Sequence, residues 1–328
     1  MPIPRLSICI PTFDRFSYLR EAVASARAQT FADIEILIGD DGNSSQLRAW
    51  SESQAAEDPR VRYLKTPERL RLAGNWNFLA EQARGEYVTF MGDDDRLLPA
   101  FVERLFAAIS ATDPSAAVVF SNHYLIGADG RRLITATYAN TKLYHRTGLC
   151  EGRVQDAAAL VWSNSVPMMA SMIRVENVRR LGFKNDINTP EMELFTRLAS
   201  EGARFIFVED YLAEYRVHAE SESARGLTLD RLAEHLERVE VSHDHEEAKR
   251  EGLRPIMIAG VGIRLQRGDV QGARSLVSSR YYPSASADAR ALMQRLLVKL
   301  PHGLIAHAYP SLRRIERSVR QKWPGFDP

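Results

Sequence analysis

Residues 85–99 read GEYVTFMGDDDRLLP, and this stretch decides the predicted fold. Residues 87–91 are short, apolar and rich in β-formers, which predicts a buried strand. Pro99 suits the first turn of a helix that we expect to reach Ser110. The three aspartates at 93–95 therefore lie on a loop between a buried strand and a helix.

The same arrangement occurs upstream. Residues 6–10 and 34–38 read as strands, with a segment of helical period at 17–29 between them, and Pro11 is expected to end the first strand. The second strand runs into GDDGNS at 39–44, a turn sequence. Alternating strands and helices predict an α/β fold, with a mostly parallel central sheet and helices on both faces. Ligands of such sheets bind at the carboxyl ends of the strands.

The last third of the chain has a different pattern. From about Thr228 apolar residues recur three and four apart, so we expect a catalytic domain at 1–220 and a helical extension at 221–328. Eight Lys or Arg residues and one Glu lie between Arg290 and Lys322, interleaved with apolar residues. This basic amphipathic segment predicts peripheral contact with an anionic membrane, and a helical cap or a homo-oligomer contact is the alternative.

Composition excludes several classes of protein. The 328 residues carry 43 Lys and Arg against 42 Asp and Glu, so no overall basic field favours nucleic acid. Two cysteines, Cys9 and Cys150, are too few for a disulfide framework. The sequence shows neither a signal-peptide pattern nor a long uncharged apolar run. We expect a cytoplasmic protein that can contact the inner face of the membrane.

The aspartate loop has the chemistry of a cation site. Hard cations such as Mg²⁺ or Mn²⁺ prefer oxygen ligands, and one or two loop carboxylates with phosphate oxygens commonly hold them. Adjacent carboxylates repel one another, and a cation would relieve that repulsion. The alternative is that Asp95 or a neighbour caps the following helix while the others are solvated.

Three motifs resemble those of one known family. SICIPTFDR at 7–15, ILIGDDGNSS at 36–45 and GEYVTFMGDDDRLLP at 85–99 look like the motifs of inverting glycosyltransferase family 2, which has the GT-A fold. The resemblance covers residues 5–218 and implies transfer of a sugar from a nucleotide-diphosphate donor, most commonly a UDP-sugar.

The resemblance also implies roles for individual residues. Family members often read D-x-D-D in the third motif, and Gly92 stands where the first Asp would fall. We expect Asp93 and Asp95 to hold the Mn²⁺ or Mg²⁺ because alternate residues of an extended segment point the same way. LAEYRVHAESES at 212–223 resembles the family's closing motif, and the resemblance implies that its His218 joins them. The residues expected at the donor nucleotide are Pro11, Thr12, Asp14, Asp40, Asp41, Arg71, Asn75, Asp94 and Arg216.

The catalytic base is expected in NDINTPEMELFTRLASEG at 185–202. Glu191 falls where the family usually has an Asp that takes the proton of the acceptor hydroxyl. Asp186 and Glu193 are its substitutes. The alternative is structural: with Asn188 as N-cap, Glu191 would be the N3 residue of a capping box.

The predicted activity is an inverting, metal-assisted single displacement onto a hydroxyl of a surface glycan or lipid-linked saccharide. A nucleotidyltransferase is an alternative, although its Gly-rich phosphate loop is missing after the first strand. A second alternative is a catalytically impaired nucleotide- or polysaccharide-binding protein of the same fold, which Gly92 and Glu191 would signal. A DxDxT phosphatase is excluded because Arg96 and Leu97 follow the aspartates.

Overall fold

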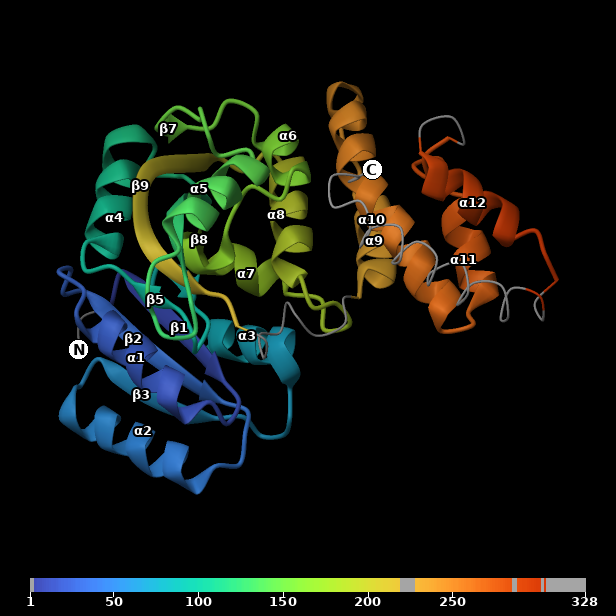
Figure 1. The fold of residues 1–328 in the computed structure, drawn as a ribbon. Coiled ribbons are helices and arrows are strands. Elements are labelled where there is room, and N and C mark those ends of the chain that lie inside the picture. The colour runs from blue at the N-terminus through green and yellow to red at the C-terminus, as the bar shows by residue number, and fades with distance from the viewer. Residues whose placement is uncertain (1–2, 219–227, 285–287, 302–303, 305–328) are drawn as a thin grey trace. The chain divides into compact units, whose positions relative to one another are not determined.

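The computed structural model describes residues 3–218, 228–284, 288–301 and 304 (Figure 1). The chain divides into two compact units, Met1–Gly226 and Leu227–Pro328. The first unit contains the sheet and the second is helical.

The first unit is built on a nine-stranded sheet with the order β3-β2-β1-β4-β8-β6-β9-β5, and β7 pairs with β9. Neighbouring strands are parallel from β3 to β4 and again between β6 and β9, whereas β8 is antiparallel to both of its neighbours. The α/β architecture expected from the sequence is present. The strands are β1 (Leu6–Thr12), β2 (Ile34–Asp40), β3 (Val61–Lys65), β4 (Tyr87–Phe90), β5 (Arg96–Leu97), β6 (Val118–Ile126), β7 (Gly152–Arg153), β8 (Ser171–Arg174) and β9 (Phe205–Arg216).

Helices cover the sheet and bury both of its faces near the centre. Every residue of β1 and β2 is buried, as expected for parallel strands with helices on each side. Helices α1 and α3 both contact these two strands. The helices of this unit are α1 (Phe16–Arg27), α2 (Ser45–Glu57), α3 (Arg71–Gln82), α4 (Phe101–Thr112), α5 (Ile134–Leu143), α6 (Ala157–Trp162), α7 (Val175–Leu181) and α8 (Pro190–Ser200), with a 3-10 turn at Met168–Ala170.

The prediction that Pro11 ends the first strand was wrong. Pro11 pairs with Gly39, and Thr12 pairs with Asp40. The backbone of Cys9 faces β4, because its carbonyl accepts a hydrogen bond from Met91, so Pro11, two residues on, faces the same side. The β1–β4 pairing ends at Cys9, and the missing N–H of Pro11 therefore costs no ladder hydrogen bond.

The long strand β9 ends beside the loop that follows β4. It runs parallel to β6 with register shifts around Asn122, and Figure 1 shows it curving across the sheet. Its last residue, Arg216, reaches the loop after β4. The closing motif thereby meets the acidic motif, which precedes it by more than a hundred residues in the sequence.

The second unit contains α9 (Leu229–Glu237), α10 (Glu246–Gln266), α11 (Val270–Val277) and α12 (Ala289–Leu297). Helix α10 packs against α9, α11 and α12, and its buried side includes Leu253, Met257 and Val261. No helix in the described ranges is long and apolar enough to cross a membrane. Most of the basic segment, including its five cations from Arg313 to Lys322, lies outside the described residues.

Candidate active site

A cavity of about 770 Å³ lies at the carboxyl ends of the central parallel strands. Thr12 ends β1, Asp41 follows β2 and Asp93 follows β4, and all three line it. In the part of the chain that the structure describes, the lining does not include Asp40, Arg216 or His218. The expected site residues that line it are Pro11, Thr12, Asp14, Asp41, Arg71, Asn75, Asp93, Asp94, Asp95 and Glu191.

Asp41 orders the loop that leads into α3. Its carboxylate accepts hydrogen bonds from the Thr66 hydroxyl at 2.9 Å, the Leu70 amide at 2.7 Å and the Arg71 amide at 2.8 Å. Arg71 has a φ of 61°, in the left-handed region that non-glycine residues rarely adopt. Asp41 therefore holds Arg71 in an unfavourable backbone conformation at the cavity wall.

The other residues expected at the nucleotide differ in their settings. Asp14, also at positive φ, accepts from the Asn43 and Ser44 amides and so fixes the turn after β2. Asp40 is buried behind the wall, where Tyr63 donates to its carboxylate at 2.7 Å. The side-chain N–H₂ of Asn75 donates to the Gly39 carbonyl, and its oxygen has no partner within the described residues. That oxygen is buried.

The acidic loop after β4 brings three carboxylates together, each with different partners. Asp93 accepts from the Thr12 hydroxyl at 2.7 Å, and Asp94 accepts from Arg15 at 2.8 Å. The Nε2 of His218 lies 2.8 Å from Oδ2 of Asp94. Asp95 accepts from the backbone amide of Arg216 at 3.0 Å. His218 thus meets Asp94, whereas we expected it beside Asp93 and Asp95.

Two of these carboxyl groups have raised pKa values. Burial, reinforced by the charge of Asp94, raises the pKa of Asp93 to about 7. The same two causes raise the pKa of Asp95 well above its usual range. The loop therefore holds more negative charge than its surroundings stabilise, and a bound cation would relieve the excess.

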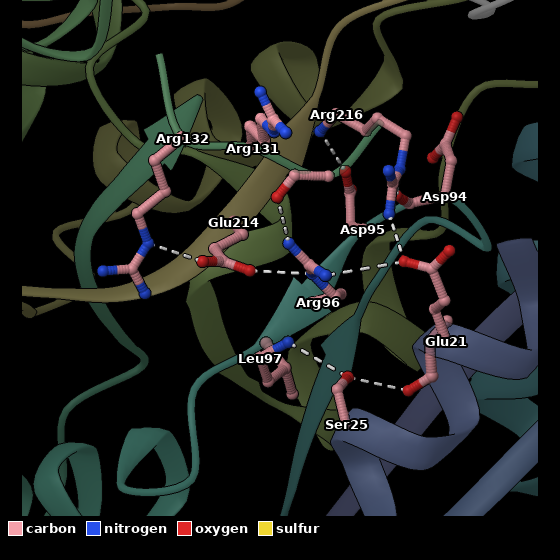
Figure 2. A network of polar contacts seen from close by, with 12 residues as sticks. Glu21, Ser25, Asp94, Asp95, Arg96, Leu97, Arg131, Arg132, Glu214 and Arg216 are labelled. Atoms are coloured by element: carbon pink, nitrogen blue, oxygen red, sulfur yellow. Dashed lines mark hydrogen bonds and ion pairs between the residues drawn. The ribbon is translucent and has the colours of Figure 1, made fainter. Parts of the chain in front are cut away.

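Arg216 anchors this loop through a network of alternating charges (Figure 2). Its guanidinium donates to the Asp94 carbonyl at 2.7 Å and pairs with Glu21 at 2.6 Å. Arg96 lies 3.5 Å from Glu21 and pairs with Glu214 at 2.8 Å. Only 1% of Arg216 is exposed. Its guanidinium is occupied by protein partners, so its setting favours positioning of the loop over the donor contact that we expected.

Gly92 is the departure from the family pattern, and the structure shows what depends on it. A Cβ at this position would lie 2.7 Å from Oδ1 of Asp94 and 2.9 Å from Oδ2 of Asp95. Real contacts of this kind are not that short, so any side chain here requires the two carboxylates to move. Their present orientation depends on a glycine at position 92.

Glu191 lies in the first turn of α8 and lines the cavity. The capping-box alternative was wrong: the N-cap is Thr189, which makes no side-chain capping bond, and Asn188 precedes it. Burial raises the pKa of Glu191 to about 7, and only its own backbone N–H opposes this rise. Of the two substitutes, Asp186 is exposed and Glu193 pairs with Arg197 at 2.7 Å. Neither lines the cavity in the described region.

Comparison with known proteins identifies relatives of this chain. A family profile described as "Glycosyl transferase family 2" matches residues 7–160. A Campylobacter jejuni GalNAc(5)-diNAcBac-PP-undecaprenol beta-1,3-glucosyltransferase is 36% identical over 31% of this chain and 34% of its own length. Glycosyltransferase GlyG of Streptococcus pneumoniae is 30% identical over 36% of this chain and 39% of its own length. The match thus spans little more than a third of either relative.

Residues 7–160 thus match glycosyl transferase family 2. Solved structures agree on the fold of the chain. S. aureus TarS 1–349 in complex with UDP-GlcNAc superposes with a TM-score of 0.67 at 16% identity, covering 97% of this chain and 92% of the TarS 1–349 chain. A Pyrobaculum calidifontis mannosyltransferase in complex with GDP-Man and Mn²⁺ gives 0.58 at 16% identity, covering 98% and 88%. The expected GT-A fold is confirmed.

A divalent metal is common in GT-A glycosyltransferases, and the acidic loop here carries side chains of the types that bind one. The described residues contain no group of three His, Cys, Asp or Glu side chains arranged to hold an ion. Mg²⁺-type sites, however, often use one or two carboxylates and take their other ligands from phosphate and water. Asp94 and His218 offer an oxygen and a nitrogen 2.8 Å apart, and the buried Asp93 lies beside them.

Sequence reasoning missed three residues of this region. Arg15 donates to Asp93 at 3.4 Å and to Asp94 at 2.8 Å. Its place directly after Asp14 in the first motif was a signal that could have found it. His123 and Arg146 also line the cavity. They lie outside every motif, and only the fold brings them to the site.

Proposed function

We propose that this chain transfers a sugar from a nucleoside diphosphate donor, a UDP-sugar foremost, to an acceptor hydroxyl with inversion at the anomeric carbon. The observation that carries the proposal is a single cavity with the acidic loop on its wall and one separate carboxylate, Glu191, whose pKa is about 7. Such a group is partly deprotonated near neutral pH and still basic enough to take a proton.

The nucleotide side of the cavity supports donor binding. Asp41 holds Arg71 and the loop before α3 in place, and Asn75 lines the same part of the cavity. Thr12 fixes Asp93. These groups line the carboxyl ends of β1 and β2, where the base and ribose would lie.

The acidic loop supports the departure of the diphosphate. Mn²⁺ or Mg²⁺, when bound, would supply positive charge to the leaving phosphates. Asp94 with His218 is the best-placed pair for the cation. Asp93 is the next candidate, because one Arg15 nitrogen contacts both aspartates and their carboxylates therefore lie close together. In this proposal Asp95 and Arg216 fix the loop, since the Arg216 backbone amide binds Asp95 and its guanidinium binds the Asp94 carbonyl.

Glu191 supports the attack on the sugar. In the proposed step its carboxylate takes the proton of the acceptor hydroxyl as that oxygen bonds to the anomeric carbon. The bond from that carbon to the diphosphate oxygen breaks on the opposite face, and the electron pair leaves with the nucleoside diphosphate. The name of the Campylobacter relative, which includes PP-undecaprenol, supports a lipid-linked saccharide as one acceptor class.

A thermal-shift screen of nucleoside diphosphates with Mn²⁺ tests donor binding, because a ligand raises apparent stability only if it binds the native state. We expect UDP with Mn²⁺ to raise Tm more than UDP alone, and hydrolysis of the matching UDP-sugar to show turnover. If no nucleoside diphosphate raises Tm with Mn²⁺, the proposed donor class is wrong. If a nucleoside triphosphate and a sugar phosphate yield pyrophosphate instead, the protein is a nucleotidyltransferase.

A further inference from the structure

Arg146 is a buried cation whose hydrogen bonds all go to uncharged groups. Only 3% of this residue is exposed. It donates to the side-chain oxygens of Asn122 at 3.1 Å and Asn140 at 2.8 Å, and to the Ser165 carbonyl at 3.3 Å. These bonds use three of its five N–H groups and leave one on each terminal nitrogen.

The charge of Arg146 is not balanced by the protein that the structure describes. None of the ion pairs there includes Arg146, whereas Arg216, equally buried, pairs with Glu21. Burial lowers the pKa of Arg146 to about 10, so it stays charged at neutral pH. A buried charge without a counter-ion is costly. An anion from outside the chain would offset that cost.

His123 on β6 is a second, independent sign of a ligand at the same place. It is 6% exposed, lines the cavity, and its Nδ1 has no hydrogen-bond partner in the described ranges. Burial, and secondarily the charge of Arg146, lowers the pKa of His123 to about 3, so the ring is neutral and has one N–H to donate. Asn140 and Asn164 line the cavity in the same region.

This region differs in position from the nucleotide residues. His123 belongs to β6, and Arg146 follows α5, whereas Thr12 and Asp41 belong to the β1–β2 half of the sheet, separated from β6 by β4 and β8. Glu191, which faces the acceptor in the proposed function, lines the same cavity. An anion bound here would therefore lie away from β1 and β2, where the proposed function places the base and ribose.

We propose that Arg146 and His123 form a subsite for a carboxylate or phosphate group on the acceptor saccharide. The guanidinium can offer an N–H from each terminal nitrogen to two oxygens of such a group, the geometry that makes arginine selective for oxyanions. The inference rests on the proposed function only in naming the occupant an acceptor; the anion site itself stands on the unbalanced charge.

Calorimetric titration of the full chain, with UDP and Mn²⁺ at saturation, tests the subsite. The probes are methyl glucuronide, glucose 6-phosphate and the neutral methyl glucoside. We expect an anionic probe to bind at least about tenfold more tightly than the neutral one, equivalent to about 1.4 kcal/mol. A preference for the glucuronide assigns an acidic sugar, and a preference for the phosphate assigns a phosphorylated acceptor. Equal binding of all three, or none up to millimolar concentration, overturns the proposal.

Variants separate the subsite from general charge effects and from the donor site. Arg146→Gln should abolish the preference and leave UDP affinity within about twofold, while the exposed Arg131→Gln should change neither. A preference that survives Arg146→Gln overturns the proposal, as does a large loss of UDP affinity in a folded Arg146→Gln. If Arg146→Gln does not fold, His123→Phe decides: it keeps a ring in place and should weaken the preference several-fold, and an unchanged preference overturns the proposal.

Discussion

The acidic loop after β4 and the first turn of α8 both present carboxylates to one cavity, and their surroundings differ. Asp93 and Asp94 share Arg15 and crowd one another, and an ion-pair network holds their loop. Glu191 has no basic side chain in the described region that lowers its pKa. Crowded carboxylates suit a cation, whereas a solitary desolvated carboxylate suits a proton. The comparison thus assigns different chemistry to the same functional group.

The largest expected effect is at Glu191. Glu191→Gln removes the proposed base and should lower kcat by about 10³-fold while leaving UDP affinity unchanged. Steady-state transfer and UDP titration measure the two quantities. Asp186→Asn, five residues earlier and exposed, is the matched control and should retain turnover. Near-normal kcat in Glu191→Gln would place the base elsewhere.

The next effect separates the carboxylates of the acidic loop. Asp94→Asn should lower kcat/KM by about 100-fold, because it removes the negative charge of the proposed cation ligand beside His218. Asp95→Asn should cost less, since an amide oxygen can still accept from the Arg216 N–H. Mn²⁺ titration of each variant measures cation affinity. A larger loss in Asp95→Asn would restore the pairing expected from the sequence.

The pH dependence of transfer should report Glu191. With its pKa at about 7, the deprotonated fraction falls about tenfold per pH unit below that value, so the single-turnover rate should fall equally and level off above it. Saturating donor and Mn²⁺ keep the acidic loop ionised during the measurement. A rate that does not vary between about pH 5 and pH 8 would contradict this role.

The smallest effect is on stability, and it has the opposite sign to the effect on activity. The pKa of Glu191 is about 7 in the native state against 4.5 for an ordinary glutamate, so the native state loses stability as pH rises from about 4.5 to about 7. Glu191→Gln should therefore stabilise the protein by about 2 kcal/mol at high pH and little at low pH. Thermal unfolding of both proteins at low and at high pH measures this difference in stability.

Glu193→Gln is the control on the same helix. This carboxylate pairs with Arg197 at 2.7 Å and is buried, so its loss should lower Tm at neutral pH. Stabilisation by Glu193→Gln, or destabilisation by Glu191→Gln above about pH 7, would show that the contrast between the two glutamates is misread.

The parts of the fold that follow local rules were predictable. The first strands and the acidic turns could be identified because apolar runs and turn residues act over a few positions. The end of β1 was misplaced at Pro11 because the cost of proline depends on which neighbour its nitrogen faces. The antiparallel β8 between β4 and β6 was not foreseen, since strand order depends on contacts distant in sequence.

The candidate site was predictable where a motif marked it. Asp41, Asp94 and Glu191 were identified as site residues and line the cavity. The partner of His218 was not predictable, because side-chain direction in a loop does not follow the alternation of a strand. Arg146 and His123 come from segments without a motif. In the described residues Arg146 has no counter-ion and Nδ1 of His123 has no hydrogen-bond partner, and a sequence alone does not reveal either fact.

Gly92 has a consequence for the evolution and engineering of this loop. Because a side chain there would collide with the carboxylates two and three positions later, inserting at position 92 the aspartate that the family motif implies should by itself be deleterious. The order of mutation matters: the neighbouring aspartates must first adopt another orientation. Exchanging residues 92–95 between homologues together with the end of β9, where Arg216 anchors the loop, avoids this dependence of one mutation on another.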